Sequence, residues 1–199
     1  MLNRVIHNQP MMQGGYAGFM LSTPAPGALE AVRQFVNTLD VETGVDQLDD
    51  VDGLRAWLVA YGLLTDAAPT AREVRRATDL REALREAMAA NHDRSDVPTE
   101  IRKILDAGAK HADLSVEFTP DRGWRTTARA PGVDGALGTL LSAVVDAMAD
   151  GTWRRLKVCA DDECRWAFYD TSRAVTGKWC TMQVCGNRAK QQAWRDRQR

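Results

Sequence analysis

Apolar residues recur every three or four positions along most of the chain, a pattern that predicts amphipathic helices. The first helix is expected near Leu29, just after the Pro24–Gly27 breaker. Thr70 and Glu73 have the spacing of a capping box at the start of the longest helix. The same periodicity predicts the remaining helices near residues 51–61, 99–110 and 133–150. The last of these has so few polar positions that we expect it at the centre of the core.

The period changes from helical to alternating at residue 114, which predicts a β-hairpin. Apolar and polar residues alternate over 114–118, a turn is expected at Pro120–Gly123, and the return strand begins at Trp124. Because a single hairpin is marginally stable, we expect it to pack on the helices or to gain a further strand. Residues 165–169 also alternate well enough to form a strand.

These elements predict a mostly helical α+β protein: a helical body with a β-hairpin, followed by a small C-terminal module with four cysteines. The apolar stripes between residues 29 and 148 are expected to suffice for a core, so we place the body at 1–151 and the module at 152–199. No linker rich in Gly, Ser or Pro precedes the first cysteine, which predicts that the module docks on the body. Asn37 and Thr38 are interpreted as capping or turn residues, the alternative being a polar contact to an effector.

Composition and charge divide the chain in the same place. Its 199 residues are 44% hydrophobic and 27% charged, as in soluble globular proteins. Residues 1–150 hold 15 basic and 22 acidic side chains, whereas 151–199 hold 11 and 5. A basic end on an acidic body is typical of a tail that meets a polyanion. No run of about 18 apolar residues occurs, so no membrane segment is expected. Since residues 1–20 also lack the pattern of a signal peptide, we predict a cytoplasmic protein.

All four cysteines lie near the C-terminus, in the pairs Cys159-x4-Cys164 and Cys180-x4-Cys185 with fifteen residues between them. Two short cysteine loops that each deliver two thiolates are the layout of a structural zinc site. Two disulfides would require an oxidising compartment, and four-cysteine iron–sulfur sites usually have tighter spacing. The remaining alternative is four free buried cysteines, but these would not be expected to cluster in one segment of the chain. The spacing therefore favours one structural Zn²⁺ held by all four residues.

The residues around the second pair of cysteines resemble the CGNR-type zinc finger, which is named for the motif at Cys185-Gly186-Asn187-Arg188. Gly177-Lys178 stands where family members often have two basic residues, and Thr181 where they often have Ser. The further residues that carry the resemblance are Phe168, Asp170, Ser172, Arg173, Trp179 and Cys180. In this small module we interpret Trp166, Phe168 and Trp179 as core residues rather than base-stacking platforms.

The same resemblance extends to the body. In that family the finger usually follows an "ABATE"-type domain, described as a "putative stress-induced transcription regulator". Residues Phe35–Leu39 and Leu54–Leu58, with Gly62-Leu63-Leu64 after them, are similar to its opening. The resemblance implies a transcription regulator whose N-terminal domain acts as a sensor of a small-molecule effector or as a dimerisation module in a homodimer.

Past Cys185 the composition predicts a helix that runs nearly to the C-terminus. Arg188, Gln191 or Gln192, and Arg195 share one stripe, and Ala189 and Ala193 keep the neighbouring face slim. Such a helix suits a duplex groove, whereas the alternative is a solvated helix whose arginines oppose its dipole. Arg188 could instead donate to a thiolate. The candidate nucleic-acid contacts are Arg173, Lys178, Arg188, Lys190, Arg195 and Arg197.

Little in the sequence points to catalysis. His7, His92 and His111 are scattered and are interpreted as surface residues, and no phosphate-binding loop or hydrolase motif is present. Four paired thiolates also close the zinc shell, whereas a catalytic zinc keeps one open position. We therefore predict that the protein is not an enzyme but a zinc-binding transcription regulator with double-stranded DNA as partner. The alternative is a zinc-stapled adaptor that binds another protein or RNA.

Overall fold

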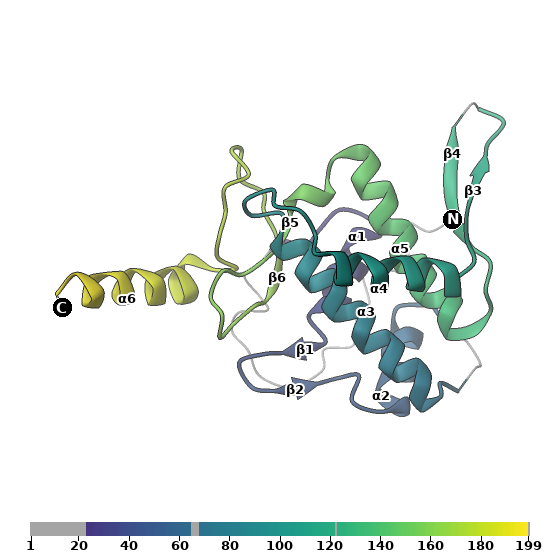
Figure 1. Cartoon of the computed structure of the whole chain (residues 1–199), viewed down its shortest axis with the longest axis horizontal. Coiled ribbons are helices and arrows are strands. Elements are labelled where there is room, and N and C mark those ends of the chain that lie inside the picture. The colour runs from purple at the N-terminus through teal and green to yellow at the C-terminus, as the bar shows by residue number, and fades with distance from the viewer. Residues whose placement is uncertain (1–22, 65–67, 122, 199) are drawn as a thin grey trace.

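The two longest elements are helices α3 (Ala71–Ala89) and α5 (Gly132–Asp150), each of 19 residues. Both are expected from the sequence periodicity. The computed structural model of the chain describes residues 23–64, 68–121 and 123–198. The expected lead-in over residues 1–20 and the terminal Arg199 lie outside the described residues. Figure 1 shows both helices in the middle of the body, where a further helix, α4 (Thr99–His111), lies across them.

Local signals set the ends of these helices. Thr70 accepts a hydrogen bond from the backbone N–H of Glu73, whose carboxylate in turn accepts from the Thr70 N–H, so the predicted capping box is confirmed. Asp50 begins α2 (Val51–Ala60) in the same way, by accepting a backbone N–H at 2.8 Å. Helix α5 stops at Gly151, whose φ of 79° is left-handed and suits a residue without a Cβ.

The core of the body lies where α1 (Leu29–Val36) and α4 (Thr99–His111) pack on α3 and α5. Phe35, Leu84 and Leu140 are among the fully buried side chains there. No residue of α4 is buried, and its expected inward residues, which are Ile101, Ile104 and Leu105, are half-buried. Helix α4 therefore covers the core from outside, whereas α5 runs through it as its composition predicts.

The predicted hairpin is confirmed as β3 (Leu114–Phe118) paired antiparallel with β4 (Trp124–Ala128). Its root packs on α5 so closely that a Cβ on Gly138 would lie 2.6 Å from the Cβ of Ala128. Its tip projects from the body (Figure 1), and Phe118 is 87% exposed. Within the described residues the hairpin gains no further strand, so packing on α5 is what holds it.

The hydrophobic core extends from the body into the C-terminal module. Trp153, Leu156, Val158 and Ala167 belong to the same buried cluster as the helices of the body. They come from a 3-10 turn (Trp153–Arg155) and from the antiparallel strands β5 (Leu156–Val158) and β6 (Ala167–Tyr169). The core therefore includes residues of the finger as well as of 29–148, and the expectation that residues 29–148 suffice for a core stays a prediction. The boundary between residues 151 and 152 stays a prediction.

Helix α5 also has the length and composition of a membrane span, with a mean hydropathy of 1.3 in its most apolar window. It is the single such helix in the described part of the chain. Nine of its residues are buried among those of α1, α3, α4 and the hairpin. Burial inside the protein accounts for this apolar character, as in the core helix of a soluble domain.

Candidate metal centre and nucleic-acid interface

The strands β5 and β6 present the first pair of cysteines. Cys159 directly follows β5, and its backbone N–H donates to the carbonyl of Trp166 just before β6 at 2.8 Å. The loop between the strands turns back through Cys164, whose N–H donates to the carbonyl of Asp161 at 2.9 Å. The sheet ladder and this turn together fix both thiols of the first knuckle on one side of the loop.

A long return loop brings the second pair to the first. The N–H of Ala160 donates to the carbonyl of Lys178 at 2.9 Å, which places the segment before Cys180 beside Cys159. A short π-helical turn, η2 (Met182–Gly186), then contains Cys185. Because this turn continues without a break into helix α6 (Asn187–Arg197), the second knuckle sets the direction in which α6 leaves the finger.

The return loop is held by a buried ion pair. Lys157, which is 1% exposed, donates to the Asp170 carboxylate at 2.9 Å and to the carbonyl of Val175 at 2.8 Å. Burial alone would raise the pKa of Asp170, but hydrogen bonds from Ser172 and Lys157 lower it to about 2. Gly177 donates its N–H to the same carboxylate at 2.8 Å, and a Cβ there would lie 2.9 Å from the carboxyl carbon. This contact accounts for a glycine at the position.

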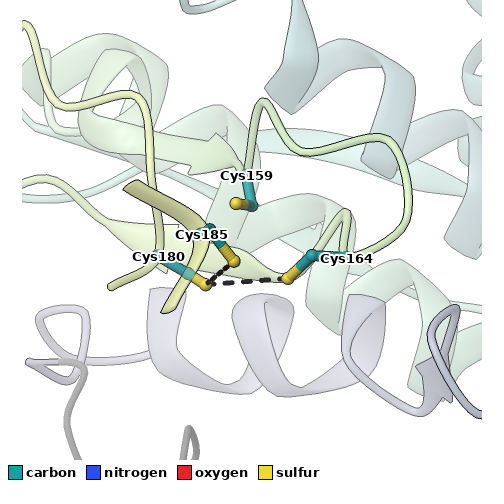
Figure 2. A group of neighbouring side chains, drawn as sticks. All are labelled: Cys159, Cys164, Cys180 and Cys185. Carbon is teal, nitrogen blue, oxygen red and sulfur yellow. Dashed lines mark hydrogen bonds between the residues drawn. The ribbon is translucent and has the colours of Figure 1, made fainter. Parts of the chain in front are cut away.

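The four thiols converge on one point (Figure 2), and all four sulfur atoms lie within 4.8 Å of one another. The Cys164–Cys180 and Cys180–Cys185 sulfur distances are 3.6 Å and 3.7 Å. A zinc ion about 2.3 Å from four tetrahedral thiolates requires sulfur separations of about 3.8 Å. The donor set and its spacing therefore fit one structural Zn²⁺, held by Cys159, Cys164, Cys180 and Cys185 as predicted.

The electrostatics of the cluster favour a bound cation. Hydrogen bonds from the thiols of Cys164 and Cys180 lower the pKa of Cys159. The same Cys159 contact raises the pKa of Cys164, and burial followed by the nearby sulfur charges raises that of Cys185. One thiolate is thus stabilised at the expense of the others. All four can ionise together only around a metal ion, which supplies the compensating charge.

Arg188 of the Cys-Gly-Asn-Arg motif lies against the cluster. Its guanidinium donates to the Cys185 sulfur at 3.8 Å and forms ion pairs with Asp161 at 3.2 Å and Glu163 at 3.6 Å. It also pairs at 3.2 Å with Glu42, in the turn between the short strands β1 (Leu39–Asp40) and β2 (Val45–Asp46). Hydrogen bonding to Glu42 is the main cause that raises the pKa of Arg188. Arg188 therefore joins both knuckles to the body.

A second link between finger and body is Asn37, at the end of α1. Its side-chain amide donates to the carbonyl of Ala167 at 3.0 Å and accepts from the N–H of Ala167 at 2.7 Å. Asn37 is 3% exposed and Ala167 is buried, so the N–H and the carbonyl of Ala167 find their hydrogen-bond partner in this side chain rather than in water. The expected capping or turn role is confirmed for both residues: Asn37 is the C-cap of α1, and the Thr38 hydroxyl donates to the carbonyl of Phe35 at 2.7 Å. The side chain of Asn37 in addition docks the finger.

Buried arginines and a histidine complete this docking surface. Arg85 of α3 is 1% exposed and donates to the carbonyls of Val36 at 2.7 Å and Arg165 at 2.9 Å. The side chain of Arg165 pairs in turn with Glu86 at 2.7 Å. His92, expected at the surface, is half-buried and donates to the carbonyl of Val158. Since Arg165 directly follows Cys164, the first knuckle is tied to the body at its own base.

The other candidate nucleic-acid contacts lie apart from these networks. Five of the six predicted cations are exposed and, within the described part of the chain, form no ion pair: Arg173, Lys178, Lys190, Arg195 and Arg197. Phe168 is buried as expected of a core residue, and Trp166 and Trp179 are half-buried. The structure thus separates Arg188, which is held by carboxylates, from the remaining cations, which are free to bind a ligand.

The helical body and the closed four-thiolate site define a zinc-binding protein with a C-terminal zinc finger. Residues 29–151 match the ABATE family, described as "Putative stress-induced transcription regulator". Residues 155–198 match the CGNR zinc finger. Because the first match spans more than half of the chain, the protein belongs to the ABATE family, and it carries the CGNR finger that the sequence resembles. A search of curated proteins found no match.

The first prediction concerns the metal. Purified protein should contain about one zinc ion per chain, and Cys185→Ser should abolish it, because structural zinc contributes about 10–16 kcal/mol to such modules. Elemental analysis after gel filtration measures the content. Thr176→Ala, at an exposed position of the return loop, is the matched control and should retain zinc. Iron in place of zinc, or full zinc content in Cys185→Ser, would contradict the assignment.

The second prediction tests the docking role of Asn37. Asn37→Ala should lower the free energy of unfolding by about 1–3 kcal/mol, because the buried N–H and carbonyl of Ala167 are left without partners. Urea unfolding of zinc-loaded protein measures the change. Gln47→Ala, at an exposed position, should change stability by less than about 0.5 kcal/mol. Equal stability of the two variants would show that the amide does not hold the finger.

Proposed function

We propose that the protein is a zinc-dependent transcription regulator that binds double-stranded DNA through its finger. The observation that carries the proposal is the position of α6, which projects away from the rest of the molecule (Figure 1). Lys190, Arg195 and Arg197 on this helix are exposed and lack an ion pair in the described part of the chain. A slender basic helix that stands clear of the fold is suited to approach the phosphates of a duplex.

The charge distribution supports a polyanionic partner. Four thiolates around Zn²⁺ remove about two positive charges from the segment, and carboxylates compensate Arg188. The charge of the cations beyond Arg188 is not compensated within α6. Its single acidic residue, Asp196, accepts a hydrogen bond from Gln192 at 3.0 Å and pairs with none of them. The acidic body would repel DNA, so a duplex is expected at the end of the molecule that α6 forms.

We assign to the body the regulation of DNA binding, either as a sensor or as a dimerisation module. A half-open cavity of about 350 Å³ lies at the surface between α3, α4 and α5, with Leu80, Ile104 and Leu137 among its apolar residues and Arg76 and His111 among its polar ones. This cavity is our candidate site for a small-molecule effector. The exposed apolar tip of the hairpin is our candidate surface for a homodimer. The proposal places the protein in the cytoplasm and assigns it no catalytic activity.

The third prediction tests the finger against duplex DNA. Zinc-loaded wild-type protein should bind a fluorescent random-sequence duplex with an affinity that falls steeply with salt. For each phosphate that a Lys190→Ala/Arg195→Ala/Arg197→Ala variant no longer binds, the slope of the log–log salt plot should fall by about 0.9. Fluorescence anisotropy at several salt concentrations measures both quantities, and zinc content is determined on the same samples.

The outcomes separate the proposal from the adaptor alternative. Arg154→Ala, which removes an exposed cation outside α6, is the control for a change of charge and should leave the slope unchanged. A zinc-replete triple variant with wild-type affinity and slope would contradict the proposal. Stronger competition by single-stranded or duplex RNA than by DNA would favour an RNA-binding adaptor. Absence of binding to any nucleic acid would favour an adaptor for proteins.

A further inference from the structure

The two sides of helix α6 differ in their surroundings. Arg188 and Ala189 are half-buried, because this side of the first turn lies against the finger and the Glu42 turn of the body. Every described residue of the helix from Lys190 onward is exposed. The position of Arg188 therefore fixes the rotation of the helix about its axis. It determines which side chains lie on the side of the helix opposite the contacts of the first turn.

Lys190, Trp194 and Arg197 follow one another at i, i+4 and i+7, so they form a single stripe along the helix. At about 100° per residue this stripe lies roughly opposite Arg188. We call these three residues the outward stripe. The residues that share a side with Arg188 are Arg195 and, less closely, Gln192. The cations that the sequence groups together are therefore divided between two sides of the helix.

Trp194 is the residue of the outward stripe that the fold itself does not explain. Trp194 is 59% exposed, and no residue of α6 is buried. Apart from two alanines and Trp194, the helix is polar, with the sequence Asn-Arg-Ala-Lys-Gln-Gln-Ala-Trp-Arg-Asp-Arg. No residue of a core surrounds the indole, so it makes no packing contribution that would account for its presence. Large exposed aromatic side chains of this kind are typical of binding surfaces.

The neighbours of Trp194 indicate what kind of partner the surface takes. Lys190 lies one turn before it and Arg197 one turn after it, and no carboxylate lies on the outward stripe. Asp196 lies nearer the finger side, where it accepts the Gln192 hydrogen bond. An indole flanked by two unpaired cations is complementary to a surface that carries regularly spaced negative charges with apolar patches between these charges. Duplex DNA presents phosphates along both edges of a groove whose floor carries thymine methyl groups.

We infer that the outward stripe is the DNA-facing surface of α6, and that Trp194 makes its apolar contact in the major groove. The inference rests on the proposed function and specifies its geometry. Lys190 and Arg197 bind phosphates, while the indole packs against base edges and thymine methyl groups between them. Ala193 beside the stripe keeps the helix slim, and a helix of about 10–12 Å matches a groove about 12 Å wide. Arg188 does not contact DNA but holds the helix in the required rotation.

The experiment uses the full-length, zinc-loaded protein and its tightest-binding duplex selected from a random pool. Trp194→Ala should weaken binding to this duplex about tenfold or more, and Trp194→Phe should restore part of the affinity. The same duplex is then prepared with deoxyuridine in place of thymidine, which removes only the 5-methyl groups. Wild-type protein should bind it about fourfold more weakly for each methyl group contacted. Trp194→Ala should bind both duplexes equally.

Gln192→Ala, on the finger side of the same helix, is the matched control and should leave affinity unchanged. If Trp194→Ala binds the duplex as tightly as the wild-type protein, the inference is overturned but the proposed function still stands. Wild-type protein that binds no duplex would overturn both. A zinc-replete Trp194→Ala protein that sediments as a smaller species than the DNA-free wild type would identify the stripe as an interface between protein copies and would also overturn the inference.

Discussion

The structure of the C-terminal segment depends on four sulfur atoms that lie within 4.8 Å of one another. Thiolates at this spacing repel one another, so the arrangement is stable in the ionised form only around a cation. That constraint joins two loops that the chain separates by fifteen residues. The approach of the two knuckles and the direction in which α6 leaves the finger follow from it. Arg188 then connects the same cluster to Glu42 of the body.

Finger and body form one structural unit because polar contacts surround their shared apolar core. Asn37 pairs with both backbone groups of Ala167, Arg85 holds the base of the first knuckle, and His92 holds the end of β5. Each of these groups is buried or half-buried, where an unpaired partner is costly. In the proposed function, these contacts are the means by which a change in the helices of the body alters the finger and α6.

The sequence predicts the local part of this structure well. Helical periodicity, the capping box at Thr70 and Glu73, the hairpin and the four zinc ligands all depend on residues near one another in the chain. The contacts that dock the finger could not be predicted, because Asn37 and Ala167 are 130 positions apart and neither has a distinctive pattern. Trp194 has no distinctive signal in the sequence for a related reason: it is exposed because α6 leaves the finger away from the rest of the molecule, and that direction is set by contacts between segments far apart in the chain.

The most direct test of this account is hydrogen exchange of the full-length protein with and without zinc. If the zinc cluster supports the shared core, removing the metal should speed exchange in the finger and also at the end of α1 and in α3, where Asn37 and Arg85 contact β6 and the first knuckle. The β3–β4 hairpin, which packs on α5 and α4, should change little. Faster exchange confined to residues 155–198 would contradict the account, because the finger would then be an independent module.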